Sequence, residues 1–363
     1  MSDSNIHEVS LAPPPVILNP GGKYAACNRR WQGISGIERT ASGRLYATWY
    51  TGGAGEGPEN HVLVVQSEDD GLSWSEPVLV IDPPGVVRAY DPVLWIDPLG
   101  RLWLLWAQVH TFWNGRGGVW FVRCDDPDAE RPAWTAPCRI ANGVMMNKPF
   151  VRANGEWLFP IAVWGWLEPC LPELKGEALS SVFATTDEGR TFVRRGGADV
   201  PCRCFDEHMV IERRDGSLWM LVRTHYGIGQ STSFDDGVTW TPGRPTDIPG
   251  PNSRFHLRRL VSGRLLLVNH VGFTGRSHLT ASLSDDDGRT WTAHLLLDER
   301  KDVSYPDATV SADGRIRIIY DRERTGAKEI LLASVTEGDI LSGQATSRGS
   351  FLRRIVSKVE ASR

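Results

Sequence analysis

The stretch SDDDGRTW at residues 284–291 is one of four copies of a short pattern along this chain. The other copies are SEDDGLSW (67–74), TTDEGRTF (185–192) and SFDDGVTW (233–240), and all read Ser/Thr-x-Asp-x-Gly-x-Ser/Thr-aromatic. The pattern is typical of a tight turn between strands, because Asp can accept hydrogen bonds from amides two residues on and Gly tolerates positive φ. The aromatic residue is expected to pack under the turn. Four copies, three ending in Trp, indicate a repeated β unit.

A second pattern, a small or polar residue followed by Gly and a hydrophobic run, counts the repeated units. It occurs around Gly43, Gly100, Gly155, Gly216, Gly263 and Gly314. Each Gly lies between two runs that are typical of strands, as in VLWIDPLGRLWLLWA (93–107). The second unit carries a degenerate turn, CDDPDAERPAW (124–134), and the sixth continues through KEILLASV (328–335). Six units of roughly 50–60 residues, with about four short strands each, predict an all-β fold and a six-bladed β-propeller.

A propeller is one cooperative unit, so residues 1–363 are expected to form a single domain. The blades are expected to begin near residues 31, 88, 145, 204, 252 and 303. The segment VSLAPPPVIL (9–18) is expected to close the ring by adding an outer strand to the last blade. A β-sandwich and a pair of smaller β domains are the alternatives to a propeller.

Composition narrows the class of protein. A net charge of −4 gives no reason to expect nucleic-acid binding. The N-terminal stretch MSDSNIHEVSLAPPP lacks an apolar core, so neither a signal peptide nor a membrane span is expected, and we expect a cytoplasmic protein. The six cysteines, of which Cys202 and Cys204 are too close for a usual zinc pair, are expected to be reduced thiols. No metal or cofactor is expected.

Functional side chains of a propeller are expected at one end of its axis, about 7–10 positions to either side of each central glycine. Polar and ionisable residues fill these windows. Before the glycines stand Asp91, Asn147, Lys148, Asp206, Glu207, His208, Arg254, His256, Tyr305 and Asp307. After them stand Tyr50, Gln108, Arg223, His225, Asn269, His270, Asp321 and Arg322. Groups from at least five blades therefore converge on one end, as in an enzyme or a ligand-binding pocket.

The four turns resemble the Asp-box (BNR) repeats of the sialidase/neuraminidase superfamily, and the resemblance covers nearly the whole chain. Three segments resemble the family's active-site segments: DEHMVIERRDGSLWMLVRT (206–224), RSHLTASLSDDDGRTW (276–291) and SYPDATVSADGRIRIIYD (304–321). They match the family's Glu to Glu207, two of its arginines to Arg223 and Arg276, and its nucleophilic Tyr to Tyr305. The resemblance thus implies a six-bladed propeller with Asp-box turns that acts on carbohydrate.

The activity implied by the resemblance is exo-hydrolysis of a terminal sugar, acidic or neutral. The Tyr305 hydroxyl, deprotonated with help from Glu207, would attack the anomeric carbon, and a phenol is repelled less by an anionic sugar than a carboxylate is. The family's acid/base Asp lies on a loop before the first Asp-box. The corresponding loop here, GGAGEGPENHVLV (52–64), carries Glu56 and Glu59 in place of Asp. Either Glu would serve as the general acid if its pKa were raised.

Arginines of the family bind the sugar carboxylate with paired N–H donors, a geometry that Lys cannot reproduce. Arg223 and Arg276 provide two of them. The third comes from an Arg-Ile-Pro motif on the first blade, where this chain has Gly-Ile-Ser (33–35). Arg30 or Gln32 could reach in from the preceding loop. This departure questions sialic acid as the substrate, but not another acidic or neutral glycan.

The histidines suggest a rival chemistry. A His/Tyr pair such as those available from His208, His225, His256, His270 and Tyr226 can abstract the C5 proton of a uronic acid and eliminate the glycosidic bond. The alternatives are therefore a polysaccharide lyase and a non-catalytic glycan-binding propeller. Further candidates for contact with the glycan are Arg254, Asp91, Lys148, Asp307, Asp321 and Arg322. The oligomeric state is left open.

Overall fold

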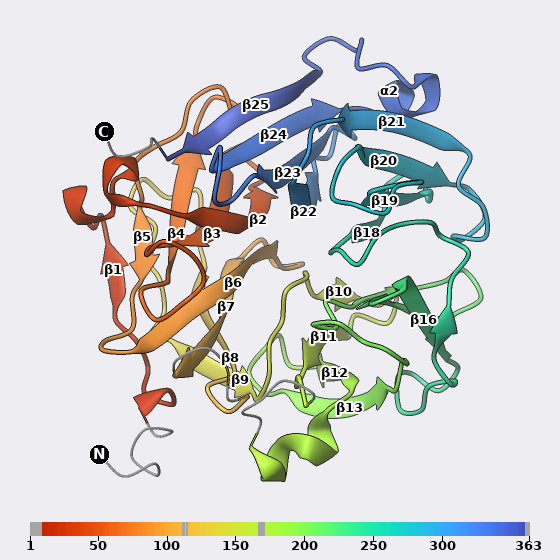
Figure 1. Cartoon of the computed structure of the whole chain (residues 1–363), viewed down its shortest axis with the longest axis horizontal. Helices are drawn as coiled ribbons and strands as arrows, with labels where there is room; N and C mark the ends of the chain where they lie inside the picture. Colours follow the sequence, from red (N-terminus) through yellow and green to blue (C-terminus); the bar gives the residue numbers. More distant parts are fainter. Residues whose placement is uncertain (1–8, 111–112, 114, 166–170, 360–363) are drawn as a thin grey trace.

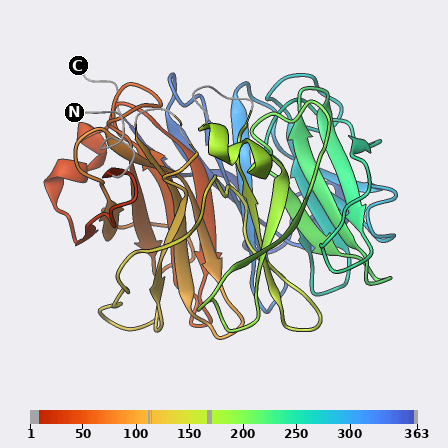
Figure 2. The same cartoon turned by 90° about the horizontal axis from the view of Figure 1, so that it is seen from below.

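The computed structural model describes residues 9–110, 113, 115–165 and 171–359 of the chain. Within them, 25 strands form six antiparallel sheets that surround one axis like the blades of a propeller (Figure 1). Figure 2 shows the same sheets from the side, with the short 3-10 helix η3 (Pro172–Glu177) above one end of the ring. The predicted all-β, six-bladed propeller is confirmed.

Each blade runs from the axis outward in chain order. The first contains β2 (Gln32–Arg39), β3 (Leu45–Thr51), β4 (His61–Ser67), β5 (Leu79–Ile81) and, outermost, β1 (Val16–Leu18). The second contains β6 (Val87–Ile96), β7 (Leu102–His110), β8 (Val119–Cys124) and β9 (Cys138–Ala141), and the third β10 (Phe150–Val151), β11 (Trp157–Ala162), β12 (Ser180–Thr185) and β13 (Val193–Ala198).

The remaining blades follow the same order. The fourth contains β14 (Met209–Glu212), β15 (Leu218–Thr224), β16 (Gly227–Ser233) and β17 (Arg244–Pro245), and the fifth β18 (His256–Arg259), β19 (Leu265–Asn269), β20 (Leu279–Ser284) and β21 (Ala293–Asp298). The sixth contains β22 (Val303–Val310), β23 (Ile316–Arg322), β24 (Glu329–Val335) and β25 (Phe351–Lys358). Outside the sheets lie η1 (Gly22–Tyr24), η2 (Ala26–Asn28) and α2 (Glu337–Ser342).

The first and last blades close the ring without sharing a sheet. The prediction that residues 9–18 add a strand to the last blade is wrong, because β1 pairs with β5 of the first blade and β25 completes the last one. Three consecutive prolines, which cannot donate to a strand ladder, restrict β1 to three residues. Side chains join the two blades instead: Thr309 Oγ1 donates to Glu38 Oε2 at 2.7 Å, and the amide of Ile37 donates to Asp307 Oδ2 at 2.9 Å.

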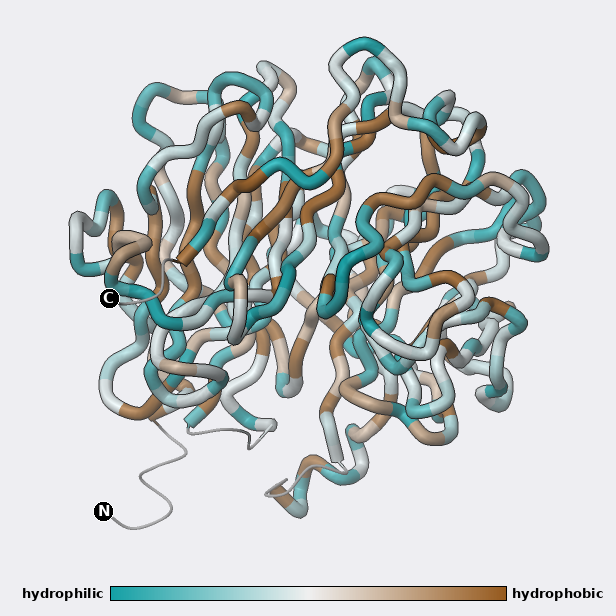
Figure 3. The backbone as a smooth tube through the Cα atoms, turned by 45° about the horizontal axis from the view of Figure 1, so that its top comes forward, coloured by the Kyte–Doolittle hydropathy of each residue, from teal (hydrophilic) through white to brown (hydrophobic). Residues whose placement is uncertain are grey.

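Hydrophobic residues are frequent along the strands, and many connecting loops are hydrophilic (Figure 3). The buried core consists largely of apolar side chains from the strands. Between the second and third blades the contacts are aromatic. Trp95 and Trp157 meet edge to face with ring centroids 5.0 Å apart, and Trp103 lies 6.2 Å from Trp157. Such pairs combine a large buried area with a defined geometry, so they fix how one blade sits on the next.

The four repeated turns connect the third strand of a blade to its fourth. In the first, the Asp69 carboxylate accepts from the amide of Ser73 at 2.9 Å and from its hydroxyl at 2.6 Å, while Ser67 Oγ accepts from the amide of Gly71 at 2.9 Å. The carboxylate thus spans four residues, and not the two expected from sequence. The aromatic residue of the turn, Trp74, is half-buried as expected.

A turn glycine also marks where one blade packs on the preceding one. A Cβ on Gly288 would lie 2.5 Å from the ring of Trp219 in the fourth blade, and a Cβ on Gly189 would lie 2.4 Å from Trp103 in the second. The turn therefore approaches its neighbour more closely than any side chain permits.

Gly288→Ala should destabilise the protein more than Gly216→Ala, which provides a matched control. Both glycines have φ of 83°, so both substitutions incur the same backbone strain, but nothing lies within 4 Å of a Cβ on Gly216. The difference in free energy of unfolding, measured with urea, should be about 1–3 kcal/mol because only Gly288 abuts Trp219. Equal losses would show that the turn does not dock on the neighbouring blade.

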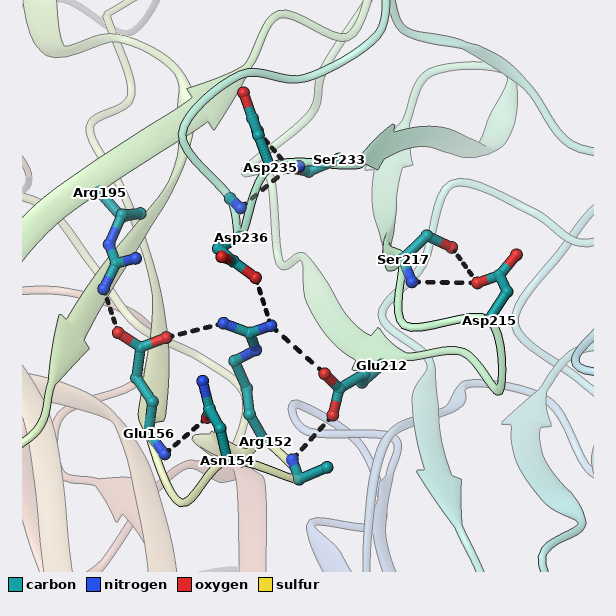
Figure 4. Close-up of polar contacts among 12 residues, drawn as sticks. Arg152, Asn154, Glu156, Arg195, Glu212, Asp215, Ser217, Ser233, Asp235 and Asp236 are labelled. Carbon is teal, nitrogen blue, oxygen red and sulfur yellow. Dashed lines mark hydrogen bonds and ion pairs between the residues drawn. The ribbon is translucent and has the colours of Figure 1, made fainter.

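Ion pairs around the buried Arg152 connect the third and fourth blades at the same rim (Figure 4). Arg152 lies 3.0 Å from Glu156, 3.3 Å from Glu212 at the end of β14, and 2.5 Å from Asp236 in a repeated turn. Arg195 also pairs with Glu156. One hairpin of the third blade thereby binds both the inner strand and the outer turn of the fourth.

Five described cysteines are unpaired, and Cys170 lies outside the described residues. No helix in the described part of the chain is long and apolar enough to cross a membrane.

Candidate active site

Three inner strands are interrupted at corresponding places by a β-bulge. The ladder shifts register between Gly33 and Gly36 in β2, between Tyr90 and Val93 in β6, and between Ser304 and Asp307 in β22. Each bulge holds a non-glycine residue with positive φ, namely Ile34 (60°), Asp91 (49°) and Tyr305 (53°). Bulges redirect side chains and are frequent beside active sites.

Proline provides a sequence signal for two of these bulges. Pro92 follows Asp91 and Pro306 follows Tyr305. A proline in a buried inner strand cannot donate to the ladder, so it fits only where the pairing is broken. The dipeptides Asp-Pro and Tyr-Pro could therefore have indicated which axis-facing residues are turned out of the regular strand.

In the fourth blade, three successive residues with left-handed backbone conformation precede β14 and redirect the chain as a bulge does in the other blades. Phe205, Asp206 and Glu207 have φ of 59°, 54° and 42°. Asp206 is held by the hydroxyl of Ser180 at 2.6 Å and by Arg203 at 3.2 Å. Backbone strain of this kind persists only where the surrounding contacts enforce it. Here those contacts fix the backbone from which Glu207 projects.

The redirected side chains surround a cavity of about 200 Å³ at one end of the axis. Residues from all six blades line it: Ile34, Tyr50, Glu56, Arg88, Tyr90, Asp91, Met146, Trp164, Phe205, Glu207, Arg223, Arg276, Tyr305 and Arg324. A wider cavity of about 590 Å³ shares Glu56, Arg276 and Arg324 with it and forms its entrance. A hollow of about 910 Å³ lies elsewhere, between the fourth and fifth blades around Trp219, and contains none of the predicted site residues.

Arg223 joins the predicted nucleophile to the predicted base. Its Nη1 lies 2.5 Å from Glu207 Oε1 and 3.3 Å from the hydroxyl of Tyr305, and its Nε donates to Asn252 Oδ1 at 2.6 Å. Burial disfavours the charged form of Arg223, but the Glu207 carboxylate, together with Tyr305 and Cys204, outweighs it and raises the pKa of the guanidinium. Among the residues described, the second carboxylate oxygen of Glu207 is buried with no hydrogen-bond partner, which leaves it able to accept a proton.

Two further guanidinium groups lie over the Tyr305 ring. The Cζ of Arg276 is 5.1 Å and that of Arg324 is 4.9 Å from the ring centroid. Arg324 Nη1 also lies 3.1 Å from Glu56 Oε1. The cavity therefore surrounds one phenol with three cations, an arrangement suited to holding an anionic ligand.

Asp91 is a buried carboxyl group in the wall of the cavity. Its side chain is 3% exposed, and its Oδ1 has no hydrogen-bond partner within the described part of the chain. Burial, and then the nearby Glu56 carboxylate, raise the pKa of Asp91 to about 8. At neutral pH Asp91 is therefore mostly protonated and able to donate a hydrogen bond to a ligand.

Asp91→Asn should make the protein relatively more stable as the pH rises. The folded-state pKa of Asp91 lies above its unfolded value, so between about pH 4 and 8 the folded protein holds one more proton than the unfolded chain, and wild-type stability falls with pH. The uncharged variant lacks this decline. Urea unfolding of both proteins at pH 5 and pH 9 measures this effect. The free energy of unfolding of Asp91→Asn relative to that of the wild type should be higher at pH 9 than at pH 5 by an amount on the order of a few kcal/mol. A constant difference would contradict the raised pKa.

Several sequence candidates form a second cluster along the axis, outside this cavity. Lys148 Nζ lies 2.9 Å from Glu38 and 3.0 Å from Asp307, and His256 lies 3.2 Å from the other Asp307 oxygen. Burial acts against the Asp307 carboxylate, but Lys148 and the His256 hydrogen bond lower its pKa overall. Arg254 is fully buried beside them and donates to Asn147 at 2.8 Å. These groups connect blades and do not line the cavity.

The histidines also lie apart from the cavity. His208 Nε2 is 2.8 Å from the carbonyl of Ser181, and His270 Nδ1 is 3.0 Å from that of Ser277. Burial lowers the pKa of both rings, that of His270 to about 4. His225 is exposed. In the described residues, no histidine contributes to the lining of the cavity.

The other candidates are distributed around the first and sixth blades. Asp321 accepts from Ser304 Oγ and from the amide of Ile34, each at 2.7 Å, and Arg322 turns away to Glu329 at 2.8 Å. Arg30 pairs with Glu59 at 3.2 Å on the surface. Gln32 donates to a carbonyl at 2.7 Å. Hence only Glu56 of the two loop glutamates reaches the cavity, and neither Arg30 nor Gln32 enters it.

Sequence reasoning missed several contributors to the site, among them Arg324, Asn252 and Trp164. Arg324 lies on the loop after β23, ten positions after Gly314 and so at the outer limit of that window, but the prediction selected only Asp321 and Arg322 there. Asn252, which orients Arg223, lies before β18 and also donates to Cys204 Sγ at 3.3 Å. Trp164 donates to the carbonyl of Phe205 at 3.0 Å and forms part of the wall. No local motif distinguishes these residues from ordinary loop residues.

Six antiparallel blades, four of them with Asp-containing turns, and a polar cavity at one end of their axis define a sialidase-like β-propeller. Residues 43–318 match the BNR repeat-like domain family, and the chain belongs to that family. Among curated protein sequences, none matches the chain.

Solved structures of sialidases share the fold. A Hadza microbial sialidase is 21% identical, with a TM-score of 0.67, and the match covers 85% of this chain and 66% of that one. The intramolecular trans-sialidase from Ruminococcus gnavus, solved with oseltamivir carboxylate, is 14% identical with a TM-score of 0.67, covering 89% and 98%. The leech intramolecular trans-sialidase is also 14% identical, with a TM-score of 0.67, covering 94% and 73%. Identities this low relate the folds and not the activities.

Proposed function

We propose that this protein is a sialidase-like exo-glycosidase that hydrolyses a terminal acidic sugar through a tyrosine nucleophile. The observation that carries the proposal is the pair of contacts made by Arg223 Nη1, which lies 2.5 Å from Glu207 and 3.3 Å from the Tyr305 hydroxyl inside the cavity. One nitrogen of the Arg223 guanidinium therefore contacts both a carboxylate and a phenol. That arrangement supports removal of the phenolic proton and stabilisation of the charge that develops on its oxygen.

The first half of the reaction would form a glycosyl-enzyme. The Tyr305 oxygen attacks the anomeric carbon as its proton passes to Glu207, and the bond to the leaving group breaks. Glu56, whose side chain is 38% exposed at the junction of the cavity and its entrance, donates the proton that the departing oxygen takes up.

In the second half, water replaces the leaving group. Glu56 removes a proton from that water, which attacks the anomeric carbon and releases the sugar. The electrons of the breaking bond return to the Tyr305 oxygen, which is reprotonated from Glu207. Attack from alternate faces in the two steps gives overall retention of configuration.

The arginines favour an acidic substrate. Arg276 and Arg324 lie over the Tyr305 ring at 5.1 and 4.9 Å, beside the position that the anomeric carbon would occupy. A sugar with a carboxylate near its anomeric carbon would pair with both, and a phenol nucleophile avoids the repulsion that a carboxylate nucleophile would meet. The lyase alternative lacks this support, since no described histidine lines the cavity.

A panel of fluorogenic glycosides tests the proposal. Release of fluorophore from an aryl α-sialoside, with little from aryl glucoside, galactoside and glucuronide, is the expected result. Appearance of an unsaturated uronate from a polyuronide would favour the lyase. Binding of sialosides without turnover would favour a glycan-binding propeller, and no turnover of any glycoside would refute the hydrolase.

Arg276→Lys should selectively weaken the binding of acidic substrates. The ammonium of Lys keeps the charge but loses the paired donors, so KM for an aryl sialoside should rise about tenfold or more. Turnover of any neutral glycoside should change little. Arg289→Lys, on an exposed turn of the same blade, is the control. An equal loss on acidic and neutral substrates would contradict a carboxylate-binding role.

A further inference from the structure

We infer that Arg324, from the sixth blade, occupies the place left by Gly33 on the first and acts as the third carboxylate-binding arginine. The inference rests on the proposed function and specifies its substrate class: a sugar whose carboxylate is held by Arg276 and Arg324 together. Arg324 lies on the loop that follows β23, ten positions after Gly314, and no turn pattern marks it.

The first step of the argument is steric. A Cβ on Gly33 would lie 2.2 Å from Arg324 Cδ and 2.7 Å from its Cγ, so the stem of Arg324 runs through the volume that a side chain at position 33 would need. Gly33 does not have positive φ, unlike most glycines of the turns. Its backbone therefore does not require glycine, and the space taken by Arg324 is what excludes a side chain.

The second step is the fixation of the guanidinium. Arg324 is bound by Glu56 at 3.1 Å and approaches Asp321 at 3.9 Å. Its Cζ lies 4.9 Å from the ring centroid of Tyr305 and 5.9 Å from that of Trp31. The Arg324 side chain is 22% exposed, so the group is held from several sides yet open toward the cavity.

The third step concerns charge. Arg223 is paired with Glu207 at 2.5 Å, so its charge is largely neutralised within the site. Arg324 also pairs with a carboxylate, but Glu56 is 38% exposed at the entrance, so solvent weakens that ion pair. Arg276 has no ion pair to a carboxylate within the described residues closer than 4.0 Å. Two guanidinium groups over one ring thus retain capacity for an anion, which fits a carboxylate better than a neutral hydroxyl.

The experiment compares oseltamivir carboxylate with its ethyl ester, which has the same ring but no negative charge. Calorimetric titration of the wild-type protein should show a preference for the carboxylate of about tenfold or more. Arg324→Ala should lose most of that preference. Gly33→Arg combined with Arg324→Ala should restore it, because the vacated volume again holds an arginine. Gly33→Arg alone should lower the melting temperature, since two side chains would compete for one space.

The outcomes separate this inference from the proposed function. Arg324→Ala with an unchanged carboxylate preference, at a melting temperature close to that of the wild type, would overturn the inference while leaving the glycosidase intact. Wild-type preference for the carboxylate without turnover of any sialoside would refute the hydrolase and leave the inference standing. A wild-type protein that binds neither compound, or both equally, would overturn it. Arg324→Lys, which retains charge and stem, reports whether paired donors are needed.

Discussion

Tyr305→Phe should abolish turnover of an acidic aryl glycoside, lowering kcat by on the order of 10³-fold or more. The phenolic oxygen is the only protein atom that bonds covalently to the sugar in the proposed reaction, and Phe cannot replace it. Binding should be largely spared, because the ring under Arg276 and Arg324 remains and only a 3.3 Å contact with Arg223 is lost.

The measurement pairs kcat for a fluorogenic sialoside with the dissociation constant for oseltamivir carboxylate. Tyr226→Phe is the matched control, because Tyr226 is an exposed tyrosine on the fourth blade, outside the cavity. The control should retain wild-type kcat. Activity in Tyr305→Phe comparable with the wild type would remove Tyr305 as nucleophile, and loss of both binding and turnover would indicate a collapsed site.

Lys148→Met should cost about 3–5 kcal/mol of stability, the largest effect expected outside the cavity. Lys148 Nζ lies 2.9 Å from Glu38 and 3.0 Å from Asp307, and it donates to the carbonyls of Ile37 and Leu94 at 2.7 and 2.6 Å. Met leaves two buried carboxylates and two carbonyls without that donor. Because these groups belong to the first, second and sixth blades, the loss should affect the whole ring.

The pH dependence of this loss has a defined sign. The folded-state pKa of Asp307 is held below its unfolded value, since Lys148 and His256 outweigh burial. The stabilisation is therefore present above about pH 4 and declines as the pH falls further. Urea unfolding should show the gap between wild type and Lys148→Met narrowing toward pH 3.

Lys358→Met, which removes an exposed partner of Glu329 at 3.4 Å, should cost less than about 1 kcal/mol and is the control. A Lys148→Met protein of normal stability with weakened glycan binding would contradict this structural role.

The sequence predicts the architecture well because turn chemistry is local. Each turn needs its own Gly and Asp, so four turns and six central glycines reveal the repeat without knowledge of the packing. The strand at 9–18 could not be assigned to the correct blade, because both the first and the last blade have an outer edge that such a strand could join. Only the pairing of Val16 with Ile81 decides between them.

The site is harder to predict from the sequence, because the windows around the glycines include residues whose side chains point in different directions. Tyr305 and Asp307 are two positions apart, yet a bulge turns Tyr305 toward the cavity while Asp307 meets Lys148 on the axis. The direction of the Tyr305 side chain depends on the bulge, and the bulge depends on how β22 pairs with β23. Arg324 lies at the outer limit of a window, but the sequence does not distinguish it from Arg322, since its position depends on the space above Gly33, a residue almost three hundred places earlier in the sequence.

The way the ring closes has a consequence for when the cavity can exist. Ile34 and Tyr305 both line it, yet their blades come from opposite ends of the described chain and share no strand. Until residues 303–358 have been made and have docked on β2, the nucleophile, Arg324 and half of the anion site are absent. The first five blades carry Glu56, Glu207, Arg223 and Arg276 but not the proposed nucleophile, so the proposed activity can arise only in the final folding event and would serve as a direct readout of it.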